Sequence, residues 1–151
     1  ESVIDEQKIP KGIQLEKDFS LNEIVLSVDS DRLRRAVINV MDNACQAMMD
    51  DNQQLKDRQN ARLNITTKNN DMRVEIAVSD TGVGMSKEVL EKTFEPLFST
   101  KVFGVGLGMA TVKQIMVQHG GGIEINSQEN KGTTVTLWLP KYPREESEVA
   151  A

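Results

Sequence analysis

The stretch DRLRRAVINVMDNACQAMM, residues 31–49, carries the strongest structural signal in the chain. Its apolar residues recur at steps of three and four, which predicts a long helix with one face against a core. The residues of this face are Leu33, Val37, Val40, Met41, Ala44 and Met48. Just before the helix, Asp29, Ser30 and Asp31 offer side chains suited to cap its N-terminus.

Working outward from this helix, the pattern predicts short strands in pairs. The expected strands are residues 13–19, 23–28, 63–67, 73–79, 123–127 and 133–139, with turns at 20–22 and 69–71 and a polar loop at 52–60. A short helix is expected from Ser86 to about Glu95, and another from Met109 to His119. Because the strands do not alternate one-for-one with helices, an antiparallel or mixed sheet with helices on one face is favoured over a doubly wound parallel sheet.

Composition narrows the class of protein. The chain has 151 residues, 38% hydrophobic and 27% charged, which predicts a single folded domain. The net charge of −5 argues against binding to nucleic-acid phosphates, and no apolar run approaches the roughly 20 residues of a membrane span. One Cys and one His exclude a disulfide framework and a His-cluster metal site. The N-terminus resembles no signal peptide and is expected to be cut from a longer chain.

Two asparagines of the long helix are the first candidate for chemistry. Asn39 and Asn43 are four residues apart, beside the small Ala36 and Ala47, so their amide oxygens can face an ion or ligand together. Asparagine is unfavourable inside helices because its amide competes for backbone hydrogen bonds. The alternative is an ordinary solvated polar face.

Two glycine-containing segments are the next candidates. In DTGVGM, residues 80–85, Asp80 follows a strand and could accept a hydrogen bond from an exocyclic amine, while Gly82 and Gly84 permit close approach; the alternative is a plain turn. In GVGLG, residues 104–108, glycines open a helix, where exposed N–H groups suit phosphate. The spacing fits neither the Rossmann nor the P-loop pattern.

The segment FEPLFSTK, residues 94–101, precedes the second glycine segment. Phe94 and Phe98 are expected to anchor it in the core, while Lys101 remains free to reach a phosphate as a point charge.

In this order, the four segments resemble the N, G1, F and G2 boxes of the ATP-binding catalytic domain of sensor histidine kinases. The superfamily also includes gyrase, heat-shock protein 90 and mismatch-repair ATPases. The matching stretches are residues 39–44, 80–85, 94–98 and 104–109, and the closing GTTVTL at 132–137 with Pro140 is also similar. The resemblance implies an α+β two-layer sandwich of the Bergerat type, with a mixed, mostly antiparallel sheet of about five strands and three helices on one face.

The resemblance also implies ATP and Mg²⁺ as ligands. Asp80 would bind the adenine amine, Asn43 would hold Mg²⁺ with support from Asn39, and Thr133 would hydrogen-bond near Asp80. The residues expected to bind nucleotide are Asn39, Asn43, Ala47, Asp80, Gly82, Gly84, Met85, Lys101, Gly104, Val105, Gly106, Leu107, Gly108 and Thr133. Those expected to act in catalysis are Asn39, Asn43 and Lys101.

One position distinguishes branches of the superfamily. Its ATP-hydrolysing and mitochondrial-kinase-like members carry a glutamate, the general base, where this chain has Asn39. An amide cannot take a proton at neutral pH, so the chain is most similar to the histidine-kinase branch. Gln46 and Ala47 stand where many of these kinases have Lys and Tyr. The short spacing between Lys101 and Gly104 resembles the nitrogen-regulation type.

The resemblance implies partners outside this chain: a histidine-bearing dimerisation domain and a response regulator receiver domain. Residues 1–11 would be the linker, 12–140 the catalytic domain and 141–151 an acidic tail, all in the cytoplasm and without direct membrane contact. His119 is expected to be a helix-terminal residue that packs locally, and Cys45 an inert thiol. Two alternatives are a nucleotide-gated interaction module without phosphotransfer and an α+β domain without a ligand.

Overall fold

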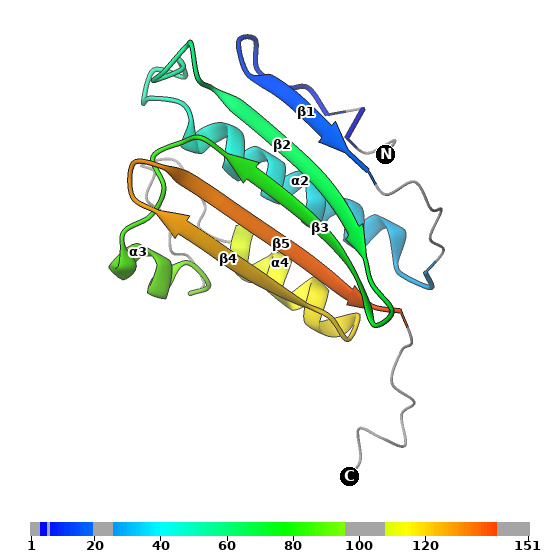
Figure 1. Ribbon diagram of the computed structural model, residues 1–151. Coiled ribbons are helices and arrows are strands. Elements are labelled where there is room, and N and C mark those ends of the chain that lie inside the picture. The colour runs from blue at the N-terminus through cyan, green and yellow to red at the C-terminus, as the bar shows by residue number, and fades with distance from the viewer. Residues whose placement is uncertain (1–3, 6, 20–25, 96–107, 142–151) are drawn as a thin grey trace.

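The computed structural model describes residues 4–5, 7–19, 26–95 and 108–141, which form a sheet and a layer of helices (Figure 1). The five strands lie in the order β1-β2-β3-β5-β4, and only the pairing of β1 with β2 is parallel. The strands are β1 (Gln14–Asp18), β2 (Arg62–Asn69), β3 (Arg73–Asp80), β4 (Gly122–Gln128) and β5 (Gly132–Pro140). The helices are α2 (Ser30–Ala47), α3 (Lys87–Lys92) and α4 (Gly108–Gln118). The predicted fold class is confirmed.

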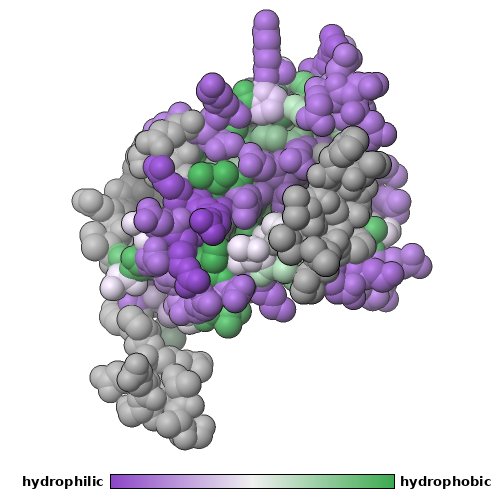
Figure 2. Space-filling model, turned by 180° about the vertical axis from the view of Figure 1, so that it is seen from behind, coloured by the Kyte–Doolittle hydropathy of each residue, from purple (hydrophilic) through white to green (hydrophobic). Residues whose placement is uncertain are grey.

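Helices α2 and α4 cover one face of the sheet, and the core lies between the two layers (Figure 1). The apolar stripe predicted for α2 is buried there against Leu63, Ile65, Val78 and Leu137. Asp29 caps α2 as expected, because its side chain accepts a hydrogen bond from the Arg32 backbone N–H at 3.2 Å. Seen from behind, this helical side of the molecule is mainly hydrophilic, with small separated apolar areas (Figure 2).

The predicted strand at residues 23–28 is wrong where the structure describes it. Residues 26–28 are irregular, and Leu26 and Val28 pack against the core from the segment that leads into the cap of α2. Strand β1 pairs instead with β2, with Gln14 opposite Arg62. The alternation of apolar residues at Leu26 and Val28 therefore reflects an irregular segment packed on the core. The predicted turn at 20–22 lies outside the described residues.

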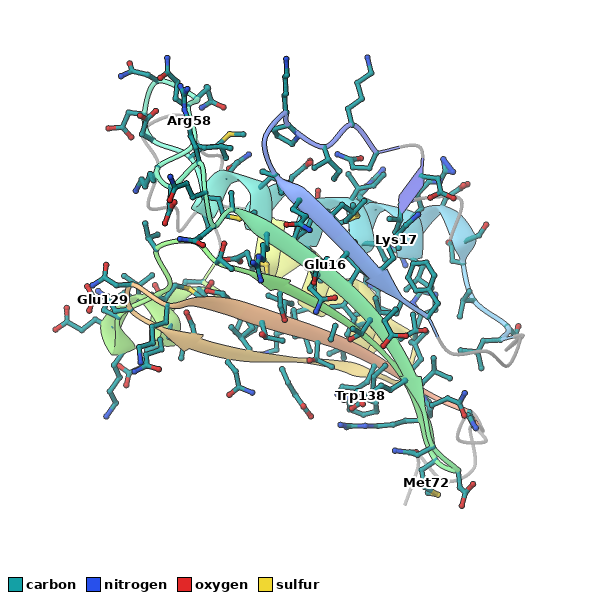
Figure 3. All side chains as sticks on the ribbon, turned by 45° about the horizontal axis from the view of Figure 1, so that its top comes forward. Glu16, Lys17, Arg58, Met72, Glu129 and Trp138 are labelled. Carbon is teal, nitrogen blue, oxygen red and sulfur yellow. The ribbon has the colours of Figure 1, made fainter. Side chains whose placement is uncertain are left out.

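The two predicted hairpins are confirmed. Between β2 and β3, the Asn70 side chain accepts hydrogen bonds from the backbone N–H groups of Met72 and Arg73, at 2.8 and 2.9 Å. Strands β4 and β5 pair antiparallel, from Gly122 opposite Trp138 at one end to Gln128 opposite Gly132 at the other. The β2–β3 turn at Met72 and the β4–β5 turn at Glu129 lie at opposite ends of the molecule (Figure 3).

The segment before β1 packs on the domain. Ile4 is buried in the core, and the Gln7 amide donates a hydrogen bond to Asp42 of α2 at 2.8 Å. No helix in the described parts of the chain has the length and apolar character needed to cross a membrane.

Candidate functional site

Three of the predicted segments meet at one end of the molecule, the end that carries the β4–β5 turn at Glu129 (Figures 1 and 3). The start of α4 lies against α2: a Cβ added to Gly108 would be 3.5 Å from Nδ2 of Asn43. The loop after β3 lies against the end of α2: a Cβ added to Gly82 would be 2.4 Å from the carbonyl oxygen of Ala47. Segments distant in sequence therefore converge on the asparagine helix.

The loop after β3 is held from both sides. The Val83 N–H donates to the Ala47 carbonyl at 3.1 Å, and the Val83 carbonyl accepts from the Asn130 N–H at 2.6 Å. Gly84 has a φ of +65°, and a Cβ there would be 2.0 Å from the Gln128 carbonyl oxygen. This backbone conformation and the close Gln128 carbonyl require a glycine at this point.

Asp80 stands at the end of β3 with its carboxylate turned back on the loop. One carboxylate oxygen accepts a hydrogen bond from the Gly82 N–H at 2.9 Å. Burial raises the pKa of Asp80 to about 6, while the N–H groups of Gly82 and Thr133 act in the opposite direction. The carboxylate is thus ionised at neutral pH and remains an acceptor for an amine donor.

Sequence reasoning missed one residue of this site, Ser127 on β4. Its hydroxyl accepts a hydrogen bond from the Met85 N–H at 2.8 Å and shares one with the Thr133 hydroxyl at 2.7 Å. Thr133 is buried opposite Asp80 in the β3–β5 register. The β4–β5 register places Ser127 opposite Thr133, a pairing that the sequence pattern did not assign.

The two helix asparagines differ in exposure. Asn43 is exposed beside Gly108, and Asn39 is half-buried one turn earlier. Within the described ranges, no group of three or more His, Cys, Asp or Glu side chains could hold a metal ion. An exposed amide oxygen nevertheless fits Mg²⁺, which keeps several waters and is commonly held by one or two protein oxygens together with substrate phosphates.

Other predicted residues have mixed outcomes. Lys101, Gly104, Val105, Gly106, Leu107 and Phe98 lie outside the described residues. Phe94 is half-buried, with the Lys113 ammonium of α4 4.9 Å from its ring centre. Burial, with the charges of Asp42 and Asp80, raises the pKa of Cys45 to about 11, consistent with an inert thiol.

A hollow of about 200 Å³ lies beside the site, behind the loop after β3. It is bordered by Met48, Lys56, Ala61 and Val83, and shares only Ala47 and Gly82 with the residues predicted to bind nucleotide. Neither Asp80 nor Asn43 lines it.

Comparison with known proteins gives a consistent result. Residues 28–143 match the family described as "Histidine kinase-, DNA gyrase B-, and HSP90-like ATPase". The chain is 37% identical over 129 residues to Sensor histidine kinase ZraS of Escherichia coli K12, and 35% identical over 118 residues to Sporulation kinase B of Bacillus subtilis 168. These matches cover 84% and 78% of this chain, but only 26% of each relative.

Solved structures agree with this match. The nucleotide-free catalytic domain of histidine kinase ThkA superposes with a TM-score of 0.73 at 27% identity, over 87% of this chain and 82% of that one. The mycobacterial sensor histidine kinase MprB gives a TM-score of 0.68 at 28% identity, over 88% of this chain and 85% of that one.

Proposed function

The chain belongs to the family of histidine kinase-, DNA gyrase B- and HSP90-like ATPases, and from that premise we propose that it is the catalytic part of a two-component sensor histidine kinase. It binds Mg²⁺-ATP and delivers the γ-phosphoryl group to a histidine on a separate dimerisation domain. That domain then passes the group to the receiver domain of a response regulator.

The observation that carries this proposal is the position of Gly108 against Asn43. It brings the N-terminus of α4, whose first N–H groups have no partner within the helix and favour phosphate, next to an exposed amide oxygen that can hold Mg²⁺. Asp80 lies at the end of the neighbouring β3 and supplies the acceptor for the adenine amine. The same small region thus offers a base contact, a metal ligand and a phosphate contact.

The other residue roles are those that the family resemblance implies, and they suit phosphoryl transfer, which needs alignment and charge neutralisation. Bound Mg²⁺ would neutralise charge on the phosphates. Asn43 holds that ion, Asn39 supports Asn43, and Lys101 contacts a phosphate. The acceptor imidazole nitrogen forms a bond to the γ-phosphorus as the bond to the bridging oxygen breaks, and ADP leaves.

The residue at position 39 supports transfer to histidine over hydrolysis. A water or serine nucleophile needs a base to remove its proton, and the Asn39 amide cannot act as one. A neutral imidazole has a lone pair and needs no such base. The isolated chain is therefore expected to bind nucleotide but to turn it over very slowly.

The proposal includes the boundaries and setting of the domain. Residues 12–140 form the catalytic domain, 1–11 the end of the linker and 141–151 a tail, and the domain works in the cytoplasm. Since Ile4 and Gln7 contact the domain, the last part of the linker packs on it.

The decisive experiment is transfer from ATP to a separately supplied histidine-bearing dimerisation domain. Asn43→Ala should abolish transfer, because the Mg²⁺ ligand is lost. Asn126→Ala, which removes an exposed asparagine of β4, is the matched control and should transfer normally. Undiminished transfer by the Asn43 variant would refute the metal role. Nucleotide binding without any transfer by the unaltered chain would instead favour a nucleotide-gated module.

A further inference from the structure

The single histidine of the chain joins the two helices of the α layer. His119 follows the C-terminus of α4, and its Nε2 accepts a hydrogen bond from the Asp29 backbone N–H at 3.0 Å. Its Nδ1 lies 2.7 Å from the carbonyl oxygen of Ile115, one turn back on α4. The sequence predicted the local packing of His119, but not the contact with Asp29.

These partners determine the form of the ring. A carbonyl oxygen can only accept, so Nδ1 carries the proton, and a backbone N–H can only donate, so Nε2 has none. His119 is therefore a neutral imidazole with both nitrogens bonded. It acts here through directed hydrogen bonds, and not as a cation that favours the helix C-terminus.

The bond joins the ends of the two helices that lie away from the nucleotide residues. Asp29 is the N-cap of α2, and a second link joins the side chains of Arg32 and Gln118 beside it. At the opposite ends of the same antiparallel pair, Gly108 of α4 meets Asn43 of α2. Because a helix of 11 residues is stiff, fixing the C-terminus of α4 also restricts where its N-terminus lies.

We infer that His119 is a positioning residue for the nucleotide site: by joining α4 to the cap of α2, it holds the N-terminus of α4 beside Asn43. This inference rests on the proposed function, because the position matters only if phosphate and Mg²⁺ bind there. His119 itself touches neither ligand.

The first test compares two replacements of His119 by calorimetric titration with Mg²⁺-ADP. His119→Leu keeps bulk and loses the acceptor, and should weaken binding about three- to fivefold, within the roughly two- to twelvefold that the net value of one hydrogen bond corresponds to. His119→Gln keeps an acceptor at similar reach and should bind within about twofold of the unaltered chain.

A control separates position from stability. Ile65→Val removes one methyl group from the buried side of β2, and is expected to lower the melting temperature by a few degrees. Strand β2 is separated in the sheet from β4 and β5, the strands that follow α4. This variant should bind Mg²⁺-ADP normally although its melting temperature falls.

A second readout follows from reciprocity, since a contact that strengthens nucleotide binding must itself be strengthened by nucleotide. The Asp29 amide should therefore exchange its hydrogen more slowly with Mg²⁺-ADP bound. Separately, the ¹⁵N spectrum of the single imidazole should show the proton on Nδ1, as its hydrogen-bond partners require.

The possible outcomes are distinct. Weaker binding by the Leu variant alone, with slower Asp29 exchange on binding, supports the inference. Equal affinities in all variants overturn it and leave the proposed function intact. Failure of the unaltered chain to bind Mg²⁺-ADP would overturn the proposed function, and this inference with it.

Discussion

Asp80, the proposed adenine-binding residue, acts against the stability of its own domain. Its carboxylate is largely buried at the end of β3 with backbone N–H donors, which only partly replace water. Because its folded pKa of about 6 exceeds the ordinary value of 3.8, the folded protein binds a proton more readily than the unfolded chain. Its contribution to stability therefore falls as pH rises from about 4 to 6.

We expect Asp80→Asn to stabilise the protein at pH 7.5 by up to about 2 kcal/mol, because it removes a poorly solvated charge. At pH 3 the difference should largely disappear, since the aspartate is then mostly protonated in both the folded and the unfolded state. The same variant should weaken ATP binding by about 1.5–3 kcal/mol, the value of a charged hydrogen bond. Thermal melts at the two pH values and calorimetric titration measure both effects. Equal melting at pH 7.5 would contradict the burial argument, and unchanged affinity the adenine role.

Alanine substitutions at two glycines of the site are expected to have different effects, one on stability and the other on nucleotide affinity. Gly84→Ala should destabilise the domain by about 2 kcal/mol or more, because the new methyl would meet the Gln128 carbonyl and the φ of +65° disfavours alanine. Gly108→Ala makes only ordinary contacts with Asn43, so denaturant unfolding should show unchanged stability. Its methyl should nevertheless weaken binding of Mg²⁺-nucleotide. Normal affinity of this variant would argue against a metal and phosphate site there.

At the scale of elements, the loop after β3 depends on the hairpin that follows α4. Ser127 of β4 provides the acceptor for the Met85 N–H, and Asn130 of the β4–β5 turn donates to Val83. The loop is thus shaped by a hairpin more than forty residues further along the chain.

We expect Ser127→Ala to weaken Mg²⁺-ADP binding about threefold or more, because the Met85 N–H loses its partner and the loop loosens. Ser79→Ala is the matched control, since it removes a hydroxyl paired with Thr134 at 2.7 Å, on the neighbouring β3–β5 pair. Both variants should lose about 1 kcal/mol of stability in denaturant, but only the first should lose affinity. Equal loss of affinity in both would mean that the effect is one of general stability.

The elements that were predicted correctly from the sequence are those that depend on residues close together along the chain. The apolar stripe of α2, the cap at Asp29 and the turn at Asn70 each depend on residues within a few positions. The pairing of β1 was missed because its partner is remote, and alternation at Leu26 and Val28 cannot distinguish a strand from a coil packed on the core.

The same distinction applies to the site. The motifs assigned Asn43, Ala47, Gly82 and Gly108 to one predicted nucleotide site, and in the structure Gly82 lies against Ala47 and Gly108 against Asn43. Ser127 and the bond between His119 and Asp29 depend on single polar residues that meet only in the folded chain. Nothing around them in sequence separates them from solvated surface residues.

At the scale of the whole molecule, the site draws on both layers, α2 and α4 from one and the ends of β3, β4 and β5 from the other. Nucleotide binding should therefore stabilise the domain as a unit. At a free concentration 100 times its Kd, Mg²⁺-ADP should raise the free energy of unfolding by about 2.7 kcal/mol. Calorimetric melts should show one transition that moves upward, whereas Mg²⁺-GTP should leave it unmoved. An equal shift with GTP would contradict recognition of adenine by Asp80.

The parallel pairing of β1 with β2 has a consequence for synthesis on the ribosome. Gln14 is opposite Arg62, so the first strand to be made has no partner until nearly fifty more residues have been added. At roughly 5–20 residues per second, this takes about two to ten seconds. During that time α2 can form, but the backbone of β1 stays unpaired. The strand of this sheet that is synthesised first is thus among the last to be paired, and a chaperone that binds nascent chains is expected to protect it during this interval.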